Sequence, residues 1–218
     1  MHHHSRPLRA LAIGLSSLAG FIDAIAFLDI GGFFVSFMSG NSTRLGVGLA
    51  LAPGAAATAA ALIGAFVVGV TTGSLIGHLA GRHRRTAVLV LVATAIILAA
   101  LLRPLASPLV AALMLAAAMG AANAAFERNG EVAFGVTYMT GALVKLGHRL
   151  ALALRGGERW SWLPYLLLWS GLAGGAWAGA LAYSRMGFGA VWLAAAFAGL
   201  FALAAAWLDR ADQSTATV

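Results

Sequence analysis

Residues 20–24 read GFIDA and residues 38–41 read MSGN; about one hundred positions later, residues 120–124 read GAANA and residues 139–142 read MTGA. The surrounding chain is apolar nearly throughout. The repetition predicts an internally duplicated membrane protein. Such folds often hold a solute site at the interface of the repeats, formed by helices that break near the middle of the bilayer.

The similarity continues beyond these motifs, because Gly40 and Arg44 correspond to Gly141 and Lys145. A third signature is a row of glycines at intervals of four, and its members are Gly69, Gly73 and Gly77 in the first half and Gly171, Gly175 and Gly179 in the second. Three signatures in the same order favour duplication over chance matches. We therefore expect two membrane repeats, residues 8–106 and 107–209. The flanking segments are an N-terminal tail with a tag-like MHHH, residues 1–7, and a disordered tail, residues 210–218.

Composition independently indicates a membrane protein. Of 218 residues, 61% are hydrophobic and 10% are charged, whereas soluble domains average about 25% charged residues. The net charge of +7 comes from basic residues in short gaps between apolar runs, a pattern that sets membrane orientation rather than nucleic-acid binding. The chain has no cysteine. We expect the lipid bilayer as a partner, no nucleic acid, and neither a metal nor a cofactor.

Eight apolar runs are separated by charged or helix-breaking gaps. If all eight crossed the membrane, the basic cluster at residues 82–85 would lie opposite Arg6 and Arg9, against the positive-inside tendency. If runs 33–52 and 132–154 are instead broken or re-entrant, six spans remain and both termini are cytoplasmic. Three spans per repeat then require inverted repeats. The predicted fold is an all-α integral membrane protein with about six spanning helices, two broken or re-entrant segments and two inverted-topology repeats.

The two interrupted runs carry the candidate site. Non-helical backbone at membrane depth is tolerated only where it is buried in protein or lines a watery cavity. A helix that restarts after Gly40 or Gly141 would present free N–H groups and a positive dipole end, which suit an anion or a polar solute. The alternative is structural: Ser and Thr bond to their own helix and Gly permits close packing. The candidate substrate-binding residues are Asp23, Ser39, Gly40, Asn41, Arg44, Asn123, Thr137, Thr140, Gly141 and Lys145.

Asp23 is the residue most costly to insert, since a carboxylate near the centre of a span costs about 2.5–3.5 kcal/mol. Arg44 is its expected partner. Three interpretations stay open for Asp23: a structural ion pair, a protonatable or cation-coordinating carboxylate, and a solvated interfacial residue. Asn123 holds the equivalent place in the second half and cannot titrate. Arg44 and Lys145 together favour an anionic or carbonyl-bearing solute, unless both extend to the lipid headgroups.

The glycine rows predict close helix packing. Two uses stay open: contacts between the two repeats, or contacts between two copies in a homo-oligomer.

The order of motifs at 20–24, 39–41, 120–124 and 137–141 resembles the YoaK-like family of bacterial inner-membrane proteins, a domain of unknown function. The resemblance covers about residues 8–208 and implies a location in the bacterial inner membrane, without an activity. Two positions depart from the family pattern: Ser39 stands where Thr is usual and keeps its hydroxyl, whereas Ala122 stands where Gln is usual and loses a polar group.

These observations favour a secondary transporter or channel for a small polar or anionic solute, with its site at the repeat interface. A non-transporting assembly or sensing protein is the alternative. An intramembrane protease would need a nucleophilic serine such as Ser39 with a histidine on a later helix, but the last histidine is His148, with two runs still to come. We therefore do not expect an enzyme.

Overall fold

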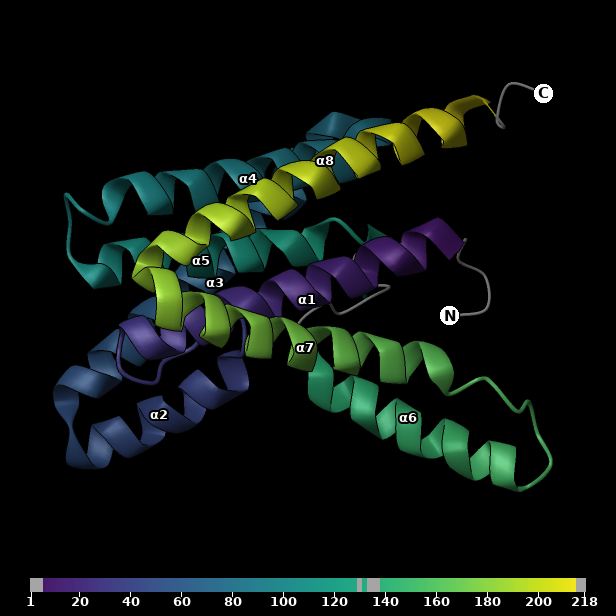
Figure 1. Ribbon diagram of the computed structural model, residues 1–218, viewed down its shortest axis with the longest axis horizontal. Helices are drawn as coiled ribbons and strands as arrows, with labels where there is room; N and C mark the ends of the chain where they lie inside the picture. The colour runs from purple at the N-terminus through teal and green to yellow at the C-terminus, as the bar shows by residue number, and fades with distance from the viewer. Residues whose placement is uncertain (1–5, 129–130, 133–137, 215–218) are drawn as a thin grey trace.

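The computed structural model describes residues 6–128, 131–132 and 138–214 (Figure 1). The elements are α1 (Arg6–Asp29), α2 (Met38–Leu51), α3 (Pro53–Ala80), η1 (Gly81–His83), α4 (Arg84–Leu102), α5 (Pro108–Ala124), β1 (Glu127–Arg128), β2 (Glu131–Val132), α6 (Met139–Leu154), α7 (Leu163–Met186), η2 (Gly187–Ala190) and α8 (Val191–Ser214). The short strands β1 and β2 pair antiparallel. All other regular elements among the described residues are helices, so the expected all-α class is confirmed.

Five helices lie in stretches that are long and apolar enough to cross a membrane, and a sixth helix is apolar but shorter. Three stretches, 7–29, 53–102 and 163–210, are long and apolar enough to span, and the last two each contain two helices joined by a 3-10 turn. The sixth is α5, a shorter apolar helix of 17 residues, about 26 Å long at 1.5 Å per residue. Helices α1, α3, α4, α5, α7 and α8 thus account for the six predicted spans.

The remaining two helices, α2 and α6, follow the interrupted stretches. They have 14 and 16 residues, about 21 and 24 Å at 1.5 Å per residue, which is short for a bilayer core of about 30 Å. Both leave the bundle obliquely and lean away from each other (Figure 1). They begin at Met38 and Met139. The expected restart after Gly40 and Gly141 is therefore wrong: both glycines lie inside the first helical turn.

The two halves of the chain interlock. Helix α1 packs most extensively on α7, α3 on α5, and α4 on α8, so each major contact joins an element of the first half to one of the second. Successive spans run in alternating directions, and the start of α1 and the end of α8 lie at the same end of the bundle (Figure 1). Ion pairs mark the two ends: Arg85 at the start of α4 meets Asp209 near the end of α8, and Arg103 after α4 meets Asp29 at the end of α1.

Glycines permit two equivalent close approaches. A Cβ added at Gly69 would lie 2.0 Å from the carbonyl oxygen of Ala117 in α5, and one at Gly175 would lie 2.0 Å from that of Ser17 in α1. Gly73 and Gly179 repeat this relation one turn later, against Ala121 and Phe21. The rows therefore pack the halves of one chain together.

Equivalence by contact differs from equivalence by motif. By motif order, Gly69 corresponds to Gly171. By contact, Gly69 corresponds to Gly175, four residues or about one turn further along, because Gly69 packs on α5 as Gly175 packs on α1. The glycines at the start of the motifs complete the pattern: a Cβ at Gly20 would meet the oxygen of Leu172, and one at Gly120 that of Phe66, each at 2.1 Å. Small residues on both partners let the backbones touch.

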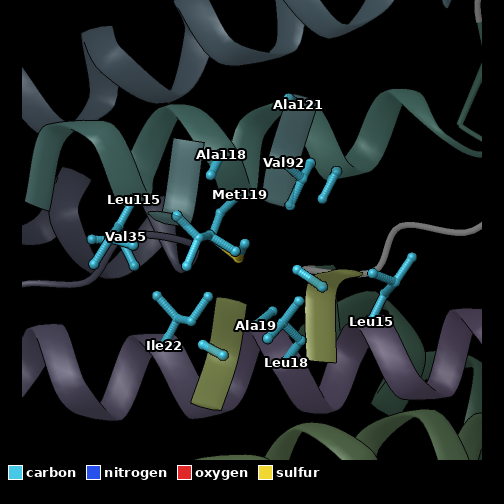
Figure 2. Close-up of a cluster of buried hydrophobic side chains, with 14 of the residues drawn as sticks. Leu15, Leu18, Ala19, Ile22, Val35, Val92, Leu115, Ala118, Met119 and Ala121 are labelled. Atoms are coloured by element: carbon cyan, nitrogen blue, oxygen red, sulfur yellow. The ribbon is translucent and has the colours of Figure 1, made fainter. Parts of the chain in front are cut away.

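The core lies where these helix pairs meet. Ile22 of α1, Leu115 and Met119 of α5, and Val92 of α4 are fully buried, and Figure 2 shows them converging with Val35 from the segment after α1. The segment between α1 and α2 is therefore part of the core.

The ends of the ordered helices differ from the predicted tails. Helix α1 begins at Arg6, and α8 continues to Ser214, so the disorder expected from residue 210 is wrong for the first five residues of that tail. Residues 1–5 and 215–218 lie outside the described residues.

Candidate functional site

The chain reverses direction directly after α1. Gly31 and Gly32 have φ angles of 72° and 88°, a left-handed conformation that glycine adopts without steric cost. The N–H of Gly32 donates to the carbonyl of Phe27 at 2.7 Å and closes the end of the helix. This turn directs residues 33–37, which are not helical, back against α1. We call these five residues the returning segment.

Asp23 binds the returning segment. One carboxylate oxygen accepts hydrogen bonds from the N–H groups of Val35 and Ser36, at 2.8 and 2.7 Å, and the other accepts one from Ser36 Oγ at 2.5 Å. The Asp23 residue is 8% exposed, so a solvated interfacial carboxylate does not describe it. These bonds satisfy backbone groups that have no helical partner, as a membrane interior requires.

Asn41 holds the same segment from the other side. Its side-chain oxygen accepts from the N–H of Phe34 at 3.1 Å, and its side-chain nitrogen donates to the Phe34 carbonyl at 2.6 Å. Asn41 is fully buried. The neighbouring Gly40 leaves room for the Phe37 ring, because an added Cβ would lie 2.6 Å from that ring. The first MSGN motif therefore shapes the segment between α1 and α2.

The predicted ion pair between Asp23 and Arg44 is wrong. The Arg44 guanidinium lies 4.5 Å from the centroid of the Phe33 ring and donates to the carbonyl of Gly31 at 3.4 Å. It is thus directed to the turn at the end of α1, while the Asp23 oxygens accept from the returning segment. The two side chains do not form an ion pair, because backbone N–H groups of the returning segment already donate to the Asp23 carboxylate.

The second half supplies a different environment for its equivalent residues. Asn123 is buried and donates to the carbonyl of Met119 in its own helix, at 3.0 Å. Four other predicted site residues are exposed, namely Ser39 in α2 and Thr140, Gly141 and Lys145 in α6. Thr137 lies outside the described residues. Because α2 and α6 diverge (Figure 1), Arg44 and Lys145 do not flank one common site.

A cavity of about 480 Å³ lies beside Asp23, between the two halves of the chain. Helices α1 and α7 form two of its walls, with Gly20, Ala24 and Leu172 among the small and apolar lining residues. The returning segment closes a third side. Further lining residues are Phe34, Ser36 and Phe37 from the returning segment, Met139 from α6 and Ala180 from α7. Asp23 is the single ionisable group among the described residues that line this cavity.

Sequence reasoning missed the aromatic part of the cavity wall. The centroid of the Phe34 ring lies 5.2 Å from those of both Phe27 and Phe37, and all three residues line the cavity. Met139, which starts α6, also reaches it and accepts a hydrogen bond from Ser16 Oγ at 3.7 Å. A phenylalanine or methionine in an apolar chain carries no local signal of such a role, although Met139 belongs to the repeated motif.

Polar clusters connect the halves at each end of the bundle. Arg103 donates to both carboxylate oxygens of Asp29, at 3.1 and 3.2 Å, and the Tyr183 hydroxyl donates to Asp29 at 3.3 Å. The hydrogen bond to Asp29 raises the pKa of the Arg103 guanidinium above its usual value. At the other end, Asp209 accepts from Arg85 at 3.2 Å and from Thr86 Oγ at 2.7 Å.

The chain resembles known sequences over nearly its whole length. A family model described as "Protein of unknown function (DUF1275)" matches residues 11–204. A curated relative from Rhizobium meliloti (strain 1021), the "UPF0700 transmembrane protein RA0705", is 38% identical over 205 residues, which cover 94% of this chain and 89% of the relative. No solved structure matches. These findings confirm the resemblance to a membrane-protein family without a known activity.

Proposed function

We propose that this chain, which belongs to the DUF1275 family of proteins of unknown function, is a secondary transporter or channel with its solute site in the cavity beside Asp23. The observation that carries the proposal is the cavity itself, which is about 480 Å³ in volume and contains a buried carboxylate. Ligand pockets in proteins commonly measure about 300–1,000 Å³ and combine apolar walls with a few polar groups. A protein that serves only as a packed membrane element has no need of such a space.

The proposed architecture is a pair of inverted-topology repeats, residues 8–106 and 107–209. The equivalent contacts of Gly69 with α5 and of Gly175 with α1 support it, as does the alternating direction of the spans. The cavity walls come from α1 of the first half and from α7 and Met139 of the second. This placement agrees with transporters in which the solute site lies at the interface of the repeats.

We place the chain in the bacterial inner membrane with both termini cytoplasmic. The pair Arg85–Asp209 supports this orientation, because it brings the basic turn after α3 to the end of the bundle where α8 finishes. The opposite end contains the pair Arg103–Asp29. An excess of arginine at one end is the usual mark of the cytoplasmic side.

The residues that line the cavity indicate which class of solute it would bind. Arg44 and Lys145, on which the expectation of an anion depended, are not among the residues that line the cavity. Asp23 and Ser36 supply its polar groups, and the rest of the described lining is apolar. A small solute with a polar or positive group therefore suits this space better than an anion.

A second candidate, a non-transporting assembly or sensing protein, has one observation in its favour. The polar residues of the first interruption are satisfied internally, since Asp23 and Asn41 both bond to residues 34–36. In that case the interruption exists to shape the fold. Both candidates are non-enzymatic, which agrees with the exposed positions of Ser39 and His148 on the diverging helices α2 and α6.

The test is solute flux into proteoliposomes that contain the full chain. A panel of labelled solutes should include organic cations, organic anions and neutral polar compounds, and we expect at least one to cross faster than into empty liposomes. Ala180→Phe narrows the cavity and should abolish that flux, whereas Leu181→Phe, at an exposed neighbouring position outside the lining, should preserve it. Absence of flux for all three classes, with protein that remains folded, would favour the assembly or sensing function.

A further inference from the structure

The geometry points to a lipophilic organic cation as the occupant of the cavity beside Asp23: a positive group carried on an apolar or aromatic body. This inference rests on the proposed function, because it names the solute class of that same site. Three independent features support it, namely the charge balance at Asp23, the aromatic wall, and the apolar opening of the cavity.

Asp23 differs from the other buried carboxylates in its charge balance. Asp29 and Asp209 each form an ion pair with an arginine, at 3.1 and 3.2 Å. Among the described side chains, no cation lies within ion-pairing distance of Asp23, which accepts hydrogen bonds only from neutral groups. Buried charges in proteins are normally paired. A cationic ligand in the adjoining cavity would complete the pair.

The aromatic wall suits a cation as well. Phe27, Phe34 and Phe37 form a connected cluster with centroids 5.2 Å apart at each step, and Phe34 meets Phe37 edge to face. The faces of phenyl rings attract cations, and clustered rings are a common way to recognise ammonium groups that cannot be fully hydrogen-bonded. Arg44 over Phe33 shows that a cation already sits on a ring of the same segment.

The opening of the cavity is apolar. Phe27, Leu28 and Phe37 line it and are 42, 48 and 38% exposed, so its rim lies on the outer surface of the helices. In a multi-pass membrane protein such a rim borders lipid, where a lipophilic cation accumulates and a strongly hydrated one does not. The cavity volume of about 480 Å³ is in the range that holds drug-sized molecules.

The experiment compares two probes of nearly identical shape and opposite charge, tetraphenylphosphonium and tetraphenylborate. Their binding to the full chain in zwitterionic nanodiscs is measured by equilibrium dialysis, with empty nanodiscs as the background. We expect the phosphonium to bind at least about tenfold more tightly than the borate, which corresponds to about 1.4 kcal/mol. Equal binding of the two probes, or no phosphonium binding above empty discs, would overturn the proposal.

Variants locate the binding. Asp23→Asn should weaken phosphonium binding about tenfold or more. Asp23 also holds the returning segment, so a second variant, Phe27→Leu, tests the site independently. It removes a ring but keeps apolar volume. We expect it to weaken phosphonium binding about 2- to 30-fold, which corresponds to cation–π energies of about 0.5–2 kcal/mol. The matched control is Phe197→Leu on the exposed face of α8, which should change binding less than about twofold. Unchanged phosphonium binding in both Asp23→Asn and Phe27→Leu would assign it to another place and refute the inference.

The two proposals fail in distinguishable ways. If an anionic or neutral solute crosses proteoliposomes in an Ala180-dependent manner while the phosphonium does not bind, the cation assignment is wrong and transport stands. If the phosphonium binds as expected but no solute of any class crosses, the cation site stands and the transport function is wrong.

Discussion

The close approach of α7 to α1 makes Gly175 intolerant of even one methyl group. A Cβ at that position would lie 2.0 Å from the carbonyl oxygen of Ser17 and 2.7 Å from its carbonyl carbon. Ordinary contacts begin near 3.4 Å. Gly175→Ala therefore requires the two backbones to separate by more than 1 Å or the helices to rotate. Overpacking of this kind costs about 1–3 kcal/mol.

The neighbouring glycine provides a matched control. Nothing lies within 4 Å of a Cβ added at Gly174, so Gly174→Ala changes only helix propensity, a gain of up to about 1 kcal/mol. Because both positions belong to the middle of α7, the propensity term cancels in the comparison. We expect Gly175→Ala to be less stable than Gly174→Ala by about 1–3 kcal/mol.

The assay is reversible unfolding of the full chain in mixed detergent micelles, followed by helix content. Gly69→Ala should behave like Gly175→Ala, since its Cβ also meets a carbonyl oxygen at 2.0 Å, whereas Gly171→Ala, at 3.0 Å from the oxygen of Ile13, should cost less. Equal stabilities for the variants at 174 and 175 would refute the packing argument. If Gly171→Ala lowers the stability as much as Gly69→Ala does, Gly171 and not Gly175 would be the equivalent of Gly69, as the motif order suggests.

Two further predictions concern the polar contacts. Arg103→Gln and Asp29→Asn should each destabilise the fold by about 1–3 kcal/mol, and the double variant should cost less than the sum of the two, because they remove the same ion pair; additive effects in the double-mutant cycle would show that the pair contributes nothing. Asn41→Ala leaves the N–H and carbonyl of Phe34 without their partners, so we expect a loss of about 1–3 kcal/mol and faster amide exchange in residues 33–37, with the exposed Ser39→Ala as the unaffected control. Exchange that stays as slow as in the parent chain would contradict the assigned role of Asn41.

Local patterns predicted the fold class and the place of the interruptions. The apolar runs and the interruption within residues 33–52 were visible, because each depends on residues adjacent in the chain. The exact start of α2 was not, since the sequence marks a break by its glycine while the helix begins two residues earlier, at Met38. Gly40 is needed there for room beside Phe37 and not to end a helix.

The candidate site was predicted in part. Asp23, Gly40 and Asn41 do meet around residues 34–36, whereas Lys145 and Thr140 lie exposed on α6. The partner of Asp23 was wrong for a physical reason. Sequence reasoning matches charge with charge, but the returning backbone supplied the donors to Asp23. Likewise Arg103, directly after α4 and 74 residues from Asp29 in the chain, paired with the carboxylate at the end of α1.

Residence in the membrane and the helical class could be read from the chain because they are properties of composition and of short-range order. The register of the glycine rows, the partners of the three buried aspartates and the aromatic cavity could not. Each of these depends on which helix faces which, and that choice is made by backbone contact between α1 and α7 and between α3 and α5, where a shift of one turn changes every pairing. Apolar side chains such as Phe27 and Phe34 become a site only when packing leaves a space between them.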